Sequence, residues 1–93
     1  MDLERLEKIA NQCRGRVEMA LHGTNDFTPE LLQKCIKAGV AKINVNKLLL
    51  EGWNEYLKEN AHKPLTQMMD EGIAVLQKDV EQWIVWAGSY GKA

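Results

Sequence analysis

Two short polar clusters, residues 22–25 and residues 44–47, hold the side chains whose types could do chemistry. A neutral imidazole is a common zinc ligand, and the backbone N–H groups of turns and helix N-termini bind anions such as phosphate. Considered alone, a single histidine is more simply structural, and glycine and asparagine more simply form turns. The candidate residues are His22, Gly23, Thr24, Asn25, Asn44, Val45, Asn46 and Lys47.

The spacing of apolar residues predicts the elements that position these clusters. Helical spacing predicts a helix over 2–13, and alternation predicts a strand over 16–21, directly before the first cluster. A second strand is expected over 40–45, followed by helices over 47–60 and 65–86. The chain therefore divides into a preceding helix (1–15), a βα unit (16–39), a second βα unit (40–61), a C-terminal helix (64–87) and a tail (88–93).

The helix between the two strands has clear boundary signals. Thr28 followed by Pro29 predicts a hydroxyl N-cap and a proline at the first helical position. Gly39 is expected to end this helix, and Asn46 is a plausible cap for the helix after the second strand. Asp26 is more simply a carboxylate near the start of a helix than a catalytic group.

The order α-β-α-β-α-α indicates an α/β fold in which a right-handed crossover connects two parallel strands. Parallel strands end at the same edge of a sheet, so both polar clusters are expected there. Two strands cannot form a closed sheet, and each keeps an open edge. The pattern is therefore typical of part of a larger sheet.

Composition and charge argue against several classes of partner. The chain has 93 residues and a net charge of -1, whereas nucleic-acid and membrane-surface binders usually carry a basic excess. No apolar run reaches the length of a membrane span, and the charged N-terminus is unlike a signal peptide. Cys13 and Cys35 are expected to be buried free thiols, which favours a cytoplasmic location. The methionines and tryptophans of the last helices are expected to be packing residues.

Three segments resemble a known family. They read Leu-His-Gly at 21–23, Ala-Gly-Val-Ala-Lys-Ile-Asn-Val-Asn at 38–46 and Gly-Ser-Tyr-Gly-Lys-Ala at 88–93. Together they resemble the last two βα units and the C-terminus of class II, zinc-dependent fructose-bisphosphate (ketose-bisphosphate) aldolases, most closely the fungal type. The resemblance covers essentially the whole chain and implies a partial (β/α)8 TIM barrel, with its site at the carboxyl ends of the strands.

The resemblance also implies roles for the two clusters. His22 aligns with a ligand of the catalytic zinc, and Asn44 aligns with the asparagine that contacts the dihydroxyacetone phosphate portion of the substrate. Thr24 and Asn25 stand where the family has glycine and serine, and Lys47 stands where it often has threonine, so Lys47 would add a positive charge beside the phosphate. The implied phosphate pocket comprises Gly23, Thr24, Asn25, Val45, Asn46 and Lys47.

The implied activity is that of an aldehyde-lyase, the reversible cleavage of a ketose bisphosphate to dihydroxyacetone phosphate and an aldehyde. A catalytic zinc takes three protein ligands, and the only other histidine is His62, which follows a helix. No general acid or base is identifiable at a strand end, so the chain alone is expected to be inactive. The alternatives are a non-catalytic phosphate-binding or protein-interaction module, and a marginally folded chain. Open strand edges and exposed apolar helix faces would favour self-association or pairing with the missing barrel portion.

Overall fold

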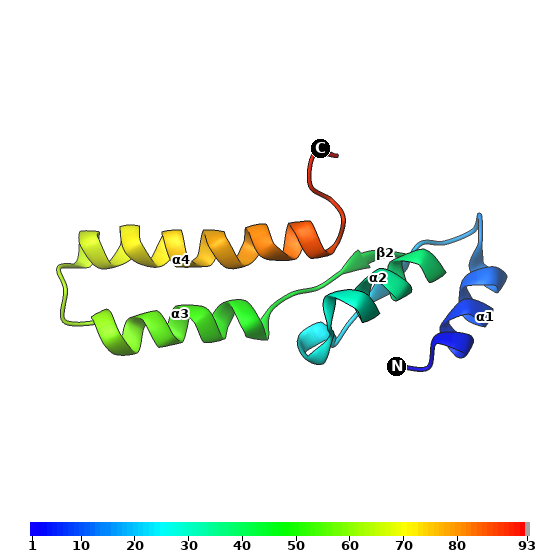
Figure 1. The fold of residues 1–93 in the computed structure, drawn as a ribbon, viewed down its shortest axis with the longest axis horizontal. Coiled ribbons are helices and arrows are strands. Elements are labelled where there is room, and N and C mark those ends of the chain that lie inside the picture. Colours follow the sequence, from blue (N-terminus) through cyan, green and yellow to red (C-terminus); the bar gives the residue numbers. More distant parts are fainter. Residues whose placement is uncertain (93) are drawn as a thin grey trace.

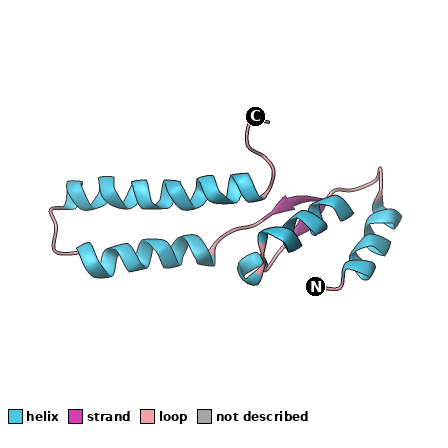
Figure 2. Cartoon of the chain, viewed as in Figure 1, coloured by secondary structure: helices cyan, strands magenta, loops and turns pink. Residues whose placement is uncertain are grey.

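A computed structural model describes residues 1–92 of the chain. Within this range four α-helices, two strands and one short 3-10 helix follow one another, in agreement with the predicted α-β-α-β-α-α order (Figure 1; Figure 2). None of the helices described is both long and apolar enough to cross a membrane. The elements are α1 (Leu3–Cys13), β1 (Met19–Leu21), η1 (Thr24–Asp26), α2 (Pro29–Ala38), β2 (Val40–Ile43), α3 (Lys47–Asn60) and α4 (Leu65–Trp86).

The first strand is shorter than the alternating pattern predicted. We expected a strand over 16–21, but β1 contains only the last three of these residues. The backbone N–H groups of Arg16 and Val17 donate to the carbonyl of Cys13 at 2.9 and 3.2 Å. These bonds extend the end of α1 into a turn, so residues 16 and 17 are not free to pair with β2.

The two strands lie side by side and run parallel, as predicted. Leu21 at the end of β1 pairs with Ile43 at the end of β2. The N–H of Asn44 then donates to the carbonyl of Leu21 at 3.3 Å, which adds one bond beyond β2, although β2 stops short of the predicted range 40–45. The carboxyl ends of both strands therefore meet at one edge.

Most of the predicted helix boundaries are confirmed by the capping contacts. Thr28 Oγ1 accepts a hydrogen bond from the N–H of Leu31 at 3.1 Å, and Pro29 is the first helical residue of α2. Gly39 ends α2 with φ of 121°. Asn46 occupies the N-cap position of α3, but its side chain makes no capping bond, so its predicted role as a side-chain cap is wrong.

Buried apolar side chains form two separate groups. Ala10 of α1, Leu32 and Cys35 of α2 and Val40 of β2 form the first group, which holds the crossover helix against the strands. The second group lies between α3 and α4, where Trp83 is buried. The molecule therefore has a βα part and a helical part, and each has its own small core.

The two cysteines are both free thiols, as predicted. Cys35 is fully buried, and burial raises the pKa of its thiol. Cys13 is only partly buried, so the expectation of two buried thiols holds for Cys35 alone.

Helices α3 and α4 form a hairpin that projects away from the strands, and the molecule is 54 Å long (Figure 1). The helices approach closely at Gly72, where a Cβ atom would lie 2.2 Å from the ring of Trp53. Trp83 and Trp86 pack edge to face, with ring centroids 5.3 Å apart. The tryptophans therefore pack as predicted, whereas Met69 is 41% exposed and does not.

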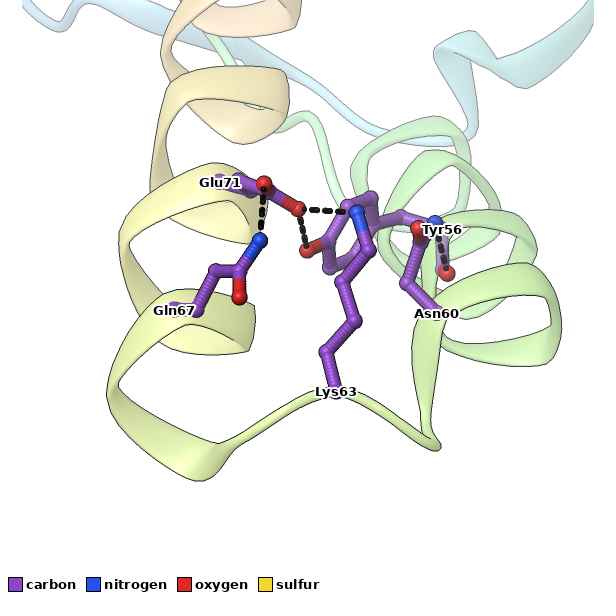
Figure 3. Close-up of polar contacts among 5 residues, drawn as sticks. All are labelled: Tyr56, Asn60, Lys63, Gln67 and Glu71. Carbon is purple, nitrogen blue, oxygen red and sulfur yellow. Dashed lines mark hydrogen bonds and ion pairs between the residues drawn. The ribbon is translucent and has the colours of Figure 1, made fainter.

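A polar cluster centred on Glu71 closes the far end of the hairpin (Figure 3). Glu71 Oε2 accepts hydrogen bonds from Lys63 Nζ and Tyr56 Oη, each at 2.7 Å, and Oε1 accepts one from Gln67 at 3.1 Å. These donors, Lys63 first, lower the pKa of Glu71 to about 2. Desolvation and the Glu71 carboxylate raise the pKa of Tyr56 to about 12. We call Tyr56, Asn60, Lys63, Gln67 and Glu71 the hairpin cluster.

Candidate functional site

The strand ends bring the two predicted clusters together. His22 follows β1 and Asn44 follows β2, and the Asn44 amide nitrogen lies 3.2 Å from Nδ1 and 3.4 Å from Nε2 of the His22 ring. The His22 side chain is exposed and Asn44 is partly exposed. A neutral imidazole has one nitrogen without a proton, and that nitrogen can either accept from the Asn44 NH2 group or bind a metal, but not both at once.

Lys42 fixes the orientation of the Asn44 side chain. Its ammonium donates a hydrogen bond to Asn44 Oδ1, so the opposite end of the amide, the NH2 group, faces His22. We did not predict this contact, although the sequence spacing of Lys42 and Asn44 could have indicated it. Lys42 and Asn44 are two residues apart, and residues at this spacing project from the same face of a strand.

Thr24 links the first cluster to the second. Its side chain is 2% exposed, and Oγ1 donates to the carbonyl of Asn44 at 2.9 Å. Gly23, which precedes it, has φ of 70°, a left-handed conformation that glycine adopts without steric cost. Thr24 therefore occupies the predicted turn as an internal hydrogen-bond donor, while the neighbouring Asn25 is exposed.

The second turn leads directly into α3. Val45 and Asn46 connect β2 to the helix, and Lys47 is the first helical residue. Lys47 Nζ lies 3.7 Å from the Glu51 carboxylate, and both side chains are more than half exposed, so this pair adds little stability. The proposed charge of Lys47 beside a phosphate stays a prediction, and Lys42 is the cation that contacts Asn44.

The described residues do not fit a complete zinc site. The exposed His22 imidazole is a suitable ligand, but His62 lies in the turn between α3 and α4, at the far end of the hairpin (Figure 1). Residues 1–92 contain no group of three His, Cys, Asp or Glu side chains that could hold a metal ion. Residues 1–92 alone therefore do not supply the three protein ligands of a catalytic zinc site.

The family is shown by a comparison that covers nearly the whole chain. The family model described as fructose-bisphosphate aldolase class-II matches residues 1–92. The chain therefore belongs to the class II fructose-bisphosphate aldolase family, and the resemblance of the three sequence segments is confirmed.

Individual relatives agree with this result. The chain is 37% identical over 94 residues to a Coccidioides immitis (strain RS) protein provisionally assigned as a fructose-bisphosphate aldolase, covering 100% of this chain and 31% of that protein. It is 33% identical over 93 residues to the 6-phospho-5-dehydro-2-deoxy-D-gluconate aldolase of Shouchella clausii (strain KSM-K16), covering 94% of this chain and 31% of that enzyme. The chain thus spans about a third of the length of these relatives.

Solved structures show the same architecture. The crystal structure of the Coccidioides immitis protein matches with a TM-score of 0.95 and 36% identity, over 100% of this chain and 36% of that one. The YdjI aldolase of Escherichia coli K12 matches with a TM-score of 0.91 and 25% identity, with the same coverage. The observed α/β arrangement of this chain is therefore that of part of a class II aldolase.

Proposed function

We propose that the chain forms the last two βα units of a (β/α)8 class II aldolase and supplies one zinc ligand and the phosphate pocket of the active site. The observation that carries this proposal is the contact of the Asn44 amide with His22 across the ends of two parallel strands. In barrels of this type, the carboxyl edge of the strands holds the catalytic residues. The reaction is the reversible cleavage of a ketose bisphosphate to dihydroxyacetone phosphate and an aldehyde.

The pocket for the phosphate lies where the two turns meet. N–H groups of the turn at 23–25 and of residues 45–47, at the start of the 14-residue helix α3, are suited to an anion. Lys42 adds a positive charge next to Asn44. In this arrangement Asn44 contacts the dihydroxyacetone portion of the substrate while the turns hold its phosphate.

His22 is the part of the chain that would hold the metal. A bound zinc ion supplies Lewis-acid polarisation of the ketose oxygen. The contact with Asn44 holds the His22 ring at the strand edge, and the ring nitrogen that binds a metal would have to be free of this contact. The other ligands and the groups that transfer protons come from outside residues 1–92, so we expect the chain alone to be inactive.

A chimera tests the proposal directly. This chain replaces the matched third of the Coccidioides immitis relative, and cleavage of fructose 1,6-bisphosphate is followed with a coupled assay. We expect an active chimera, loss of at least about 100-fold in kcat/KM for His22→Ala, and no change for the matched control His62→Ala. A folded, zinc-loaded chimera that is inactive, or one that tolerates His22→Ala, contradicts the proposal.

The alternative is a phosphate-binding module without catalysis. The exposed His22 and the paired turns at the strand ends would serve either function. This alternative predicts an inactive chimera together with binding of dihydroxyacetone phosphate by the chain itself, and that binding is lost in Asn44→Ala. Two free thiols support the further proposal that the protein works in the reducing cytoplasm.

A further inference from the structure

Lys42 lies on β2 beside the candidate site but belongs to neither of its two turns. Its ammonium donates a hydrogen bond to Asn44 Oδ1, and the NH2 group of the same amide reaches the ring of His22. Neither of the ion pairs found among residues 1–92 involves Lys42. Within the described part of the chain, the charge of Lys42 therefore acts on an amide oxygen and is not neutralised by a carboxylate.

An irregularity in the strand pairing aims Lys42 at the site. One step along β1 moves its partner on β2 by two residues, from Val40 to Lys42, so Ala41 has no residue opposite it. In a regular strand Val40 and Lys42 would share a face, yet Val40 is buried in the core of the βα part and Lys42 is exposed. An extra residue of this kind bends a strand and re-aims its side chains, and such bulges are common next to active sites. The bulge therefore separates Lys42 from the core and leaves it on the face of Asn44.

The contact with Lys42 decides what Asn44 can offer to a ligand. A side-chain amide has an oxygen that accepts hydrogen bonds and an NH2 group that donates two. With its oxygen held by Lys42, Asn44 can only donate, and one of its two amide hydrogens is enough for the contact with His22. A cation on the oxygen also polarises the amide and makes the NH2 group a stronger donor. Asn44 is thereby suited to a ligand oxygen that only accepts, such as a ketone oxygen or an oxyanion.

We propose that Lys42 is a positioning residue that makes the site specific for a ketone over an alcohol at the central carbon of a three-carbon phosphate. The inference rests on the proposed function and deepens it, because it names the group that keeps the Asn44 amide in one orientation. Without Lys42, the amide can turn over and present its oxygen, which repels a ketone oxygen but accepts from an alcohol hydroxyl. Dihydroxyacetone phosphate and glycerol 3-phosphate carry the same phosphate and differ only in this group.

Calorimetric titration of the zinc-loaded chimera with these two ligands tests the proposal. We expect dihydroxyacetone phosphate to bind more tightly than glycerol 3-phosphate, and Lys42→Met to lower this ratio of affinities at least about 10-fold, as for loss of a hydrogen bond to a charged group. The matched control Lys34→Met removes an exposed lysine from α2 and should leave the ratio unchanged. Because glycerol 3-phosphate should still bind to Lys42→Met, its titration also verifies that this variant is folded.

Two further variants show whether Lys42 acts through Asn44. Lys42→Arg keeps a cationic donor, so it should retain the ratio of affinities to within about 3-fold. In the Asn44→Ala background, the additional change Lys42→Met should alter the ratio by less than about 2-fold, because the amide that Lys42 orients is gone. A merely structural role of Lys42 would not produce this dependence on Asn44.

Two results overturn the inference while leaving the proposed function intact. In the first, an active chimera keeps its ratio of affinities in Lys42→Met, which means that Lys42 contributes at most a charge near the phosphate. In the second, Lys42→Met changes the ratio as much in the Asn44→Ala background as in its presence, which means that Lys42 meets the ligand directly. A chimera that is folded and zinc-loaded but inactive overturns the proposed function, and this inference with it.

Discussion

At the strand ends, Asn44 is the centre of a polar network, and at the far end of the hairpin Glu71 is the centre of another. Asn44 connects residues 20 or more positions away, since it contacts His22 and accepts from Thr24. Glu71 accepts from residues between 4 and 15 positions away, all in the same hairpin. One network joins two strands, whereas the other closes a local turn.

The two networks also differ in whether they leave polar groups free to bind a ligand. Three donors surround the Glu71 carboxylate, so this network serves stability. The network of Asn44 ends at the exposed ring of His22 beside two turns, so it can still bind a ligand. A saturated network stabilises a fold, and one that ends in exposed groups at a strand edge is suited to a site.

After His22, the largest effect is expected at Asn44. Asn44→Ala removes the contact with His22 and the group proposed to bind the dihydroxyacetone portion. In the chimera we expect kcat/KM to fall about 100-fold, in the range typical for loss of a polar group that acts in the transition state. The control is Asn54→Ala, an exposed amide on α3. Equal activity of the two variants would show that Asn44 has no part in the site.

The next largest effect is expected at Gly72, where the two helices of the hairpin approach closely. Gly72→Ala places a methyl group against the ring of Trp53, so it should lower the free energy of unfolding by about 1–3 kcal/mol. Gly52→Ala is the matched control, because its Cβ meets only the carboxylate tip of Asp79, which can move. The control should be neutral or stabilising by up to about 1 kcal/mol, owing to helix propensity. Urea unfolding measures the free energy of unfolding of both variants. Equal destabilisation by the two changes would contradict the close packing of Gly72 on Trp53.

A smaller effect is expected at Thr24. Thr24→Val keeps the shape of the side chain but removes the hydroxyl that donates to the Asn44 carbonyl. The free energy of unfolding should fall by about 1 kcal/mol, and binding of dihydroxyacetone phosphate should weaken as Asn44 becomes less ordered. Thr66→Val, at an exposed position on α4, is the control. If binding is unchanged although stability falls, Thr24 does not position the site.

The smallest effect concerns the pH dependence of the hairpin cluster. The pKa of Glu71 is lowered from 4.5 to about 2, so its contribution to stability is fully present above about pH 4.5 and is lost as the pH falls toward 2. Thermal melts of the wild type and Glu71→Gln should therefore differ above this window and converge below it. Glu59→Gln, an exposed acid on α3, is the control. A difference between the two melting temperatures that stays constant with pH would contradict a stabilising role of the ionised Glu71 carboxylate.

Local signals predicted the helices well, since capping depends on residues close in sequence. Thr28 and Pro29 set the start of α2, and Gly39 its end. Asn46 failed as a cap because the chain turning from β2 into α3 places its backbone at φ of -137° and ψ of -69°, without a side-chain bond. Composition alone does not determine this conformation.

The candidate site could be predicted only in part. The resemblance located His22 and Asn44, and the parallel pairing of β1 with β2 brings them together. The hydroxyl bond of Thr24 depends on the register between the strands, which no local pattern determines.

We propose that the two strand ends form one binding site. Titration of the isotopically labelled chain with dihydroxyacetone phosphate, followed by backbone and side-chain amide NMR signals, measures this directly. We expect that signals from residues 22–25 and from residues 44–47 shift together with one dissociation constant, while those of the hairpin cluster do not move. Shifts in a single turn, separate affinities for the two turns, or an unperturbed spectrum would contradict it.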